Sequence, residues 1–239
     1  MTSGTRESRT GYAIHTLTAS GAVVAMLALQ AILDGDVRGA LVWLLISQVL
    51  DGLDGPVARK YDVMVHAPRI DGHVLDLVVD YVTCVVVPIT FMMKFAMLPP
   101  HYATEIAGTK YLFSALWFAR TDLETPDMWF NGFPAAWNLA IPSLYVAHAS
   151  VTVVAIVSVV LCLSQLTNFQ FPHIVRSEWM RHITLPFGVA YLVNLAYISL
   201  AYDDVHGIQL SALTGTILFA FPAYAFTIGV IRTLRLKRS

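Results

Sequence analysis

The sequence predicts an all-α, polytopic membrane protein, and three observations support this fold class. Of the 239 residues, 56% are hydrophobic and only 13% are charged, whereas about a quarter of the residues of a soluble domain are charged. The mean hydropathy is +0.63. Apolar runs of about twenty residues, enough for one helix to cross a bilayer, recur along the chain. We therefore expect residues 1–239 to form a single integral-membrane domain, a transmembrane helical bundle surrounded by the lipid bilayer.

Four spans are predicted in the first half of the chain. Their approximate bounds are residues 12–33, 40–61, 71–93 and 103–120. An Asp-Gly-Asp turn closes the first span. Gly55-Pro56 should loosen the second, because proline lacks the backbone donor that a helix interior needs. A loop over residues 62–70 precedes the third span.

Four more spans complete the expected bundle of about eight. No Asp, Glu, Lys or Arg occurs from Ala135 to Leu166, a run of 32 residues. One helix needs only about twenty residues to cross a bilayer, so this run predicts a hairpin of two short spans that turns near His148. The last two spans are expected at about residues 185–201 and 209–231.

The basic residues are distributed asymmetrically over these spans. Twelve of the fifteen Lys and Arg fall on one side, together with two polar tails at about residues 1–11 and 232–239. Basic residues concentrate in cytoplasmic loops. Both tails and the loop at 62–70 are therefore expected in the cytoplasm, and the loop at 202–207 outside. The net charge of −1 gives no reason to expect nucleic acid as a partner.

Four aspartates at helical spacing lie between residues 51 and 80. Asp51 and Asp54 are three residues apart and Asp76 and Asp80 are four apart, so each pair lies on one face of a helix. A carboxylate at the centre of a membrane helix costs roughly 2.5 to 3.5 kcal/mol, so four together need compensation. Two divalent cations would offset all four charges, which predicts a two-metal site at the membrane surface.

Two other interpretations compete with a metal site. The aspartates could cap helix ends or pair with Arg59, Lys60 and Arg69, but Asp76 and Asp80 lie two and three turns into a span, where a loop arginine reaches them with difficulty. They could instead carry ions or protons in a cation or proton transporter. Transporters line several spans with polar groups, however, and most spans of this chain offer few.

Eight identities at fixed spacing coincide in this region, and together they resemble the signature of CDP-alcohol phosphotransferases, membrane enzymes that make phospholipids from CDP-activated donors. The identities are Asp51-x2-Asp54-Gly55-x2-Ala58-Arg59 followed by Gly72-x3-Asp76-x3-Asp80. The resemblance implies a catalytic domain with a six-helix core, a homodimer, and metal binding by Asp51, Asp54, Asp76 and Asp80. It further implies that Asp80 is the general base and that the CDP-binding surface consists of Gly55, Ala58, Arg59 and Gly72.

The departures from the common signature resemble one bacterial branch of this family. Twelve residues separate Arg59 from Gly72, where most of the family has eight. Three features resemble the sequences of the branch that condenses CDP-diacylglycerol with choline to phosphatidylcholine and releases CMP. They are this longer gap, the dipeptide Asp51-Gly52 and the segment 132–138. The resemblance implies Mn²⁺, with Mg²⁺ as the alternative, and a bacterial inner membrane. The asymmetry of basic residues places the active site on the cytoplasmic side of that membrane. Serine, glycerol phosphate and inositol remain alternative acceptors.

An aromatic segment is the expected choline site. A quaternary ammonium cannot donate a hydrogen bond and is commonly held by aromatic faces. The candidates for choline binding are Trp129, Phe133, Trp137 and Asn138. The alternative is that these rings form an aromatic belt at the membrane interface.

Overall fold

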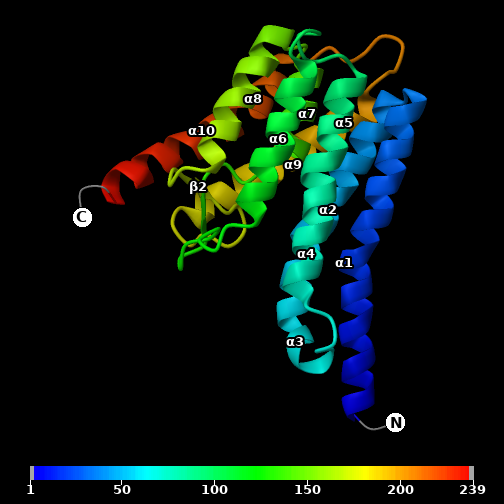
Figure 1. Ribbon diagram of the computed structural model, residues 1–239, viewed down its shortest axis with the longest axis vertical. Coiled ribbons are helices and arrows are strands. Elements are labelled where there is room, and N and C mark those ends of the chain that lie inside the picture. Colours follow the sequence, from blue (N-terminus) through cyan, green and yellow to red (C-terminus); the bar gives the residue numbers. More distant parts are fainter. Residues whose placement is uncertain (1–2, 237–239) are drawn as a thin grey trace.

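The computed structural model describes residues 3–236, and most of these residues are helical (Figure 1). This confirms the predicted all-α class. The helices at the eight predicted spans are α1 (Ser3–Asp34), α2 (Val37–Lys60), the continuous α4, η1 and α5 (Gly72–Asp80, Tyr81–Val86 and Val87–Lys94), α6 (Ala103–Phe118), α7 (Trp137–Val146), α8 (Val151–Gln165), α9 (Arg181–Ala201) and α10 (Ala212–Leu236). A short helix, α3 (Val63–His66), lies in the loop predicted at 62–70.

Five helical segments among the described residues are long and apolar enough to cross a membrane: α1, α2, α4 to α5, α9 and α10. Helices α6, α7 and α8 contain 16, 10 and 15 residues. At a rise of 1.5 Å per residue, they are roughly 15 to 24 Å long, shorter than a hydrocarbon core of about 30 Å. The polytopic membrane fold is therefore confirmed, whereas the number of spans stays a prediction. The chain turns between α7 and α8 at His148, which has a positive φ of 51°.

The terminal helices extend further than the sequence predicts. α1 begins at Ser3 and α10 continues to Leu236, so most of the predicted polar tails, residues 1–11 and 232–239, is helical. The tail residues 1–2 and 237–239 lie outside the described part of the chain. Tertiary contact explains the extension of α1: a Cβ on Gly11 would lie 2.9 Å from the Cβ of Ala67, directly after α3. Packing of this kind stabilises helix beyond what intrinsic propensity supports.

Helices α2 and α4 both pack against α1, and these three helices form the part of the bundle that carries the aspartates. The approach of α1 to α4 is close, because a Cβ on Gly21 would lie only 2.6 Å from a methyl group of Val79. Small residues allow such contacts between membrane helices. Asp36 and Asp71 cap the N-termini of α2 and α4 by accepting hydrogen bonds from first-turn N–H groups.

A two-stranded sheet connects two loops in the second half of the chain, and the sequence does not predict it. β1 (Trp129–Asn131) pairs antiparallel with β2 (Gln170–Pro172). Strands of three residues are too short for an alternating pattern to be recognised. Arg120, after α6, donates to the carbonyl oxygen of Gln165 at the end of α8 at 2.9 Å. The α6–α7 and α8–α9 connections are thereby joined.

Figure 1 shows α3 and the N-terminal end of α1 at one end of the molecule and the α9–α10 connection at the other. At that second end, Asp204 accepts a hydrogen bond from the backbone N–H of Arg38, at the start of α2, at 3.0 Å. In the predicted topology these two ends lie on opposite sides of the membrane.

We expect Met64→Cys in α3 and Val205→Cys in the α9–α10 connection to be labelled from opposite sides of the membrane. Both positions are accessible, with exposed fractions of 83% and 84%, and the native Cys84 and Cys162 would first be replaced by alanine. A membrane-impermeant maleimide added to intact cells should modify Val205→Cys, and should modify Met64→Cys only after lysis. Labelling of both positions in intact cells would contradict the predicted topology.

Candidate active site

Three of the four predicted aspartates converge at one point in the bundle. Asp51 lies on α2, Asp76 and Asp80 lie on α4, and one carboxylate oxygen from each lies within 4.8 Å of the others. Asp54, one turn further along α2, is buried and lines the same small cleft as Asp51 and Asp80. The cleft encloses about 10 Å³, room for about one water molecule or bare ion. The fold thus brings together side chains from two separate helices.

Helix α1 forms another wall of this cleft. Thr18 and Gly21 line it beside Asp54. Sequence reasoning missed Thr18, because a single threonine in an apolar span shows no spacing pattern with the aspartates.

The helix that carries Asp76 and Asp80 widens into a π-helical turn, η1, directly after them. Such turns are rare and occur frequently at functional sites. One inserted residue rotates the downstream part of a helix by about 100° relative to the upstream part. The buried Val85 and Val87 can therefore pack in the apolar core while Asp76 and Asp80 point toward Asp51.

Within residues 3–236, none of the four carboxylates has an ion-pair partner. Two full negative charges 4.8 Å apart repel by about 3 kcal/mol at an effective dielectric constant of about 20. Among the described residues, no lysine or arginine forms a salt bridge with any of the four. Asp36 and Asp71 cap α2 and α4 instead. These findings argue against the capping and pairing interpretation and favour a bound cation as the compensation.

Charged residues of the loops lie near the cluster. Arg176 forms a salt bridge with Glu124 at 3.1 Å, and the charges of both act on Asp76. Burial, followed by the charges of Arg176 and Arg59, lowers the pKa of His173 to about 4. The imidazole is therefore neutral at pH 7, while Arg59 and Arg176 supply positive charge on the loop side of the cluster. Sequence spacing could not identify Glu124 or Arg176, which are far from the aspartates along the chain.

The residues predicted to bind CDP lie at the end of α2 and the start of α4. Arg59 is exposed and folds back over Gly55, where a Cβ would lie 3.2 Å from a guanidinium nitrogen. A Cβ on Gly72 would lie 3.1 Å from the ring of His15. Ala58 packs beside a small apolar cluster between α1 and α3. Ala58 and Gly72 therefore serve packing beside α1, whereas Gly55 leaves space for the Arg59 side chain of its own helix. The role of these residues toward CDP stays a prediction.

The residues predicted to bind choline do not form an open aromatic wall. Trp129 and Trp137 are 0% and 1% exposed. Each already carries a cation of the protein over its ring: the Arg232 guanidinium carbon lies 4.7 Å from the centroid of Trp129, and Lys110 Nζ lies 3.8 Å from that of Trp137. Phe133 packs edge-on against Trp137 at 4.9 Å. A cation of the protein occupies one face of each tryptophan, so these two buried rings present no exposed aromatic wall, and their role toward choline stays a prediction.

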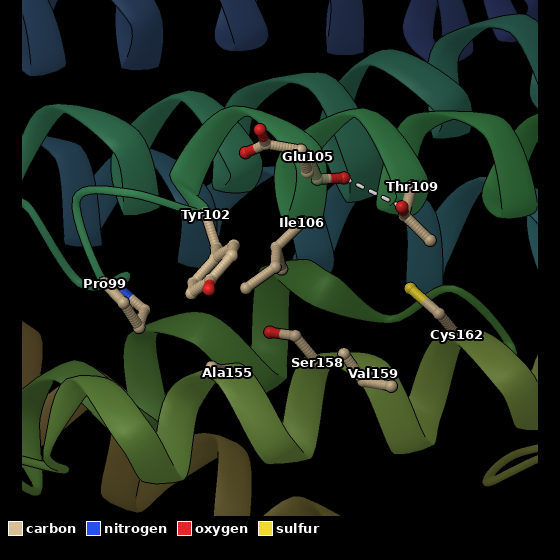
Figure 2. A pocket seen from close by; sticks show the side chains of 9 residues that line it. All are labelled: Pro99, Tyr102, Glu105, Ile106, Thr109, Ala155, Ser158, Val159 and Cys162. Carbon is tan, nitrogen blue, oxygen red and sulfur yellow. Dashed lines mark hydrogen bonds between the residues drawn. The ribbon is translucent and has the colours of Figure 1, made fainter.

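A cavity of about 270 Å³ lies between α6 and α8 (Figure 2). Its lining is mostly apolar, and none of the four aspartates contributes to it. Glu105 is its one charged lining residue, and in Figure 2 the carboxylate of Glu105 points away from α8. The cavity is therefore separate from the acidic cleft.

Comparison with known proteins agrees with the arrangement of the aspartates. Residues 14–190, which include all four, match the family model described as CDP-alcohol phosphatidyltransferase. The chain belongs to this family. The phosphatidylcholine synthase of Pseudomonas aeruginosa is 35% identical over 183 residues, 77% of each chain. Those of Rhizobium meliloti and Borreliella burgdorferi are 31% identical over 193 residues (81% of this chain and 80% of the relative) and 27% identical over 227 residues (94% of each).

Membership of the family gives the acidic cluster a chemical purpose. The family uses a divalent metal, and carboxylate oxygens are the ligands that hard divalent cations prefer. Asp51, Asp76 and Asp80 offer such oxygens within 4.8 Å of one another, with Asp54 in the same cleft. The donor set therefore fits a divalent cation.

Trp137→Ala is expected to destabilise the protein rather than to weaken choline binding selectively. The change removes the hydrogen bond from Trp137 Nε1 to Ser114 at 2.9 Å and the ring beneath Lys110, and truncating a buried tryptophan costs about 3 to 5 kcal/mol. Thermal unfolding in detergent should show a lower midpoint, while the choline KM of the folded fraction stays within about twofold of the parent's. Trp43→Ala, at a half-buried position on α2, is the control and should lower the midpoint less. A large rise in choline KM at an unchanged midpoint would place choline on this ring after all.

Proposed function

We propose that this protein is a phosphatidylcholine synthase, which transfers the phosphatidyl group of CDP-diacylglycerol to choline and releases CMP. The observation that carries the proposal is the meeting of Asp51, Asp76 and Asp80 within 4.8 Å in a CDP-alcohol phosphatidyltransferase whose relatives are named phosphatidylcholine synthases. We further propose that it acts as a homodimer in the bacterial inner membrane, with the active site facing the cytoplasm.

In this proposal Asp51, Asp54 and Asp76 hold two Mn²⁺ ions, or alternatively Mg²⁺, with Asp80 beside them as a further ligand. When bound, the cations neutralise the donor's pyrophosphate and stabilise the oxygens that attack and leave. The ligands lie on two helices that both pack against α1, which keeps their oxygens converged. Arg59, with Gly55, Ala58 and Gly72 beside it, binds the CDP moiety, since a guanidinium pairs well with phosphate.

Asp80 is proposed as the general base. The hydroxyl of choline is a weak nucleophile and becomes reactive when its proton is removed during attack. Its oxygen forms the new bond to the phosphorus that carries diacylglycerol, the proton goes to Asp80, and the bond from that phosphorus to the CMP oxygen breaks. Asp80 lies about 6 Å further along α4 than Asp76 at 1.5 Å per residue. This separation allows one carboxylate to hold a cation while the other meets the acceptor.

Choline selection is proposed to depend on charge. A trimethylammonium group carries a fixed positive charge. Two divalent cations balance the four carboxylates, so the site with bound donor keeps the negative charge of the pyrophosphate, which attracts that group. Serine and glycerol phosphate would bring negative charge toward the same carboxylates and should be disfavoured. Because Trp129 and Trp137 are covered by Arg232 and Lys110, electrostatic attraction replaces the aromatic wall in this proposal.

The decisive experiment gives the purified protein CDP-diacylglycerol and a panel of alcohols, with CMP release as the measurement. We expect release with choline and Mn²⁺, little release with serine, glycerol phosphate or inositol, and none after exhaustive chelation. Four carboxylates beside a pyrophosphate would repel it without metal. Full turnover after chelation would contradict the metal site. Preference for serine over choline would refute the choline assignment and leave the family reaction intact.

The aspartates are expected to differ in the step that they affect. Asp80→Asn should lower kcat strongly and leave the KM for CDP-diacylglycerol nearly unchanged, because it removes a base and keeps the shape of the side chain. Asp51→Ala and Asp76→Ala should also raise the Mn²⁺ concentration that turnover needs. Steady-state kinetics at several Mn²⁺ concentrations separates these effects. If Asp80→Asn turned over like the parent, the base would lie elsewhere.

A further inference from the structure

Two amide side chains connect the acidic cluster to α7. The Nε2 group of Gln48, one turn before Asp51 on α2, donates to Oδ2 of Asp51 at 3.3 Å. The Nδ2 group of Asn138, in the first turn of α7, donates to Oε1 of Gln48 at 2.8 Å. Asn138 is 3% exposed. The two hydrogen bonds form a continuous relay from α7 to the carboxylate of a proposed metal ligand.

The chemistry of the carboxylate determines the orientation of both amides. An ionised carboxylate only accepts hydrogen bonds, so Gln48 presents its NH₂ group to Asp51 and its carbonyl oxygen to Asn138. Asn138 then has to present its own NH₂ group. The reverse orientation would place the carbonyl oxygen of Gln48 against the negative carboxylate. Loss of the donor on Asn138 therefore acts on Asp51 through Gln48.

Asn138 is held in place by a buried polar cluster from α6 and α8. Its neighbour Trp137 donates to Ser114 Oγ at 2.9 Å, and Gln165 Nε2 donates to the same oxygen at 3.1 Å. Lys110 lies over the ring of Trp137 and donates to Ser158 Oγ at 3.0 Å. Rotation of the first turn of α7 would break these contacts. The relay is therefore anchored at the end remote from the aspartates.

We propose that Asn138 is a positioning residue that orients the Asp51 carboxylate through Gln48. The proposal rests on the proposed function, in which Asp51 binds a divalent cation. Repulsion from Asp76 and Asp80 favours rotation of Asp51 away from the cluster, and the hydrogen bond from Gln48 opposes that rotation. It engages Oδ2 and leaves the other oxygen for the cation. Partners that orient a metal ligand in this way typically change metal affinity about 10- to 100-fold when they are removed.

The test compares Mn²⁺ binding by the parent protein and by Asn138→Leu, which nearly keeps the shape and removes the donor. Released from Asn138, Gln48 no longer holds its NH₂ group toward Asp51. We expect the Mn²⁺ dissociation constant, measured from the electron paramagnetic resonance signal of free Mn²⁺, to rise about tenfold or more. The Mn²⁺ concentration for half-maximal CMP release should rise in parallel, with little change in choline KM.

Matched variants separate positioning from folding. Asn194→Leu makes the same change at a buried asparagine on α9, which donates to the carbonyl of Thr214 at 3.0 Å, and should leave Mn²⁺ affinity within about twofold of the parent's. The double variant Gln48→Asn with Asn138→Gln keeps the summed length of the two side chains and should recover most of the lost affinity. If Asn138→Leu does not fold, Gln48→Met removes the relay in its place.

Unchanged Mn²⁺ affinity in Asn138→Leu and Gln48→Met, or an equal loss in Asn194→Leu, would overturn the positioning role. The proposed function is judged separately, by choline-dependent CMP release from the parent protein. A parent that binds Mn²⁺ with the expected dependence on Asn138 but does not use choline would keep the relay and refute the acceptor. A parent that releases CMP with choline, but whose Mn²⁺ affinity does not change in Asn138→Leu, would support the proposed function and refute the relay.

Discussion

Mutual repulsion among the carboxylates on α2 and α4 is the energetic problem that this fold has to solve. Three oxygens within 4.8 Å of one another repel in pairs by about 3 kcal/mol when ionised, and lipid offers no water to screen them. The close approach of α1 at Gly21 and the π-helical turn after Asp80 hold this geometry. A divalent cation is the component that balances the charge.

The second half of the chain contributes support and loop charges to this arrangement. Lys110 is fully buried, and its ammonium group contacts Ser158, Met92 and the ring of Trp137. This cluster fixes the start of α7, and the small sheet fixes the loops that carry Glu124 and Arg176. Aromatic residues that resemble a ligand wall in the sequence therefore act as internal cation-binding and packing groups.

The fold class follows from hydropathy, because burial of apolar surface in lipid is its main driving force. Each of the eight predicted segments corresponds to a helix, and the turn at His148 lies where a charge-free run of 32 residues places it. The two features of the fold that the sequence did not predict share one cause. The extension of α1 depends on contact with Ala67, and the sheet depends on pairing between residues 129–131 and 170–172, so local pattern cannot reveal either.

Spacing along the chain is sufficient to place Asp51, Asp54, Asp76 and Asp80 on common helix faces, because a separation of three or four residues is a local property of a helix. Other features of the site are not local properties of one helix. They are the distances between aspartates on different helices, the contribution of Thr18, the relay through Gln48 and Asn138, and the burial of the tryptophans. They arise where segments far apart in sequence pack together, and a side chain's neighbours decide whether it offers its polar or aromatic surface to a ligand or to its own protein.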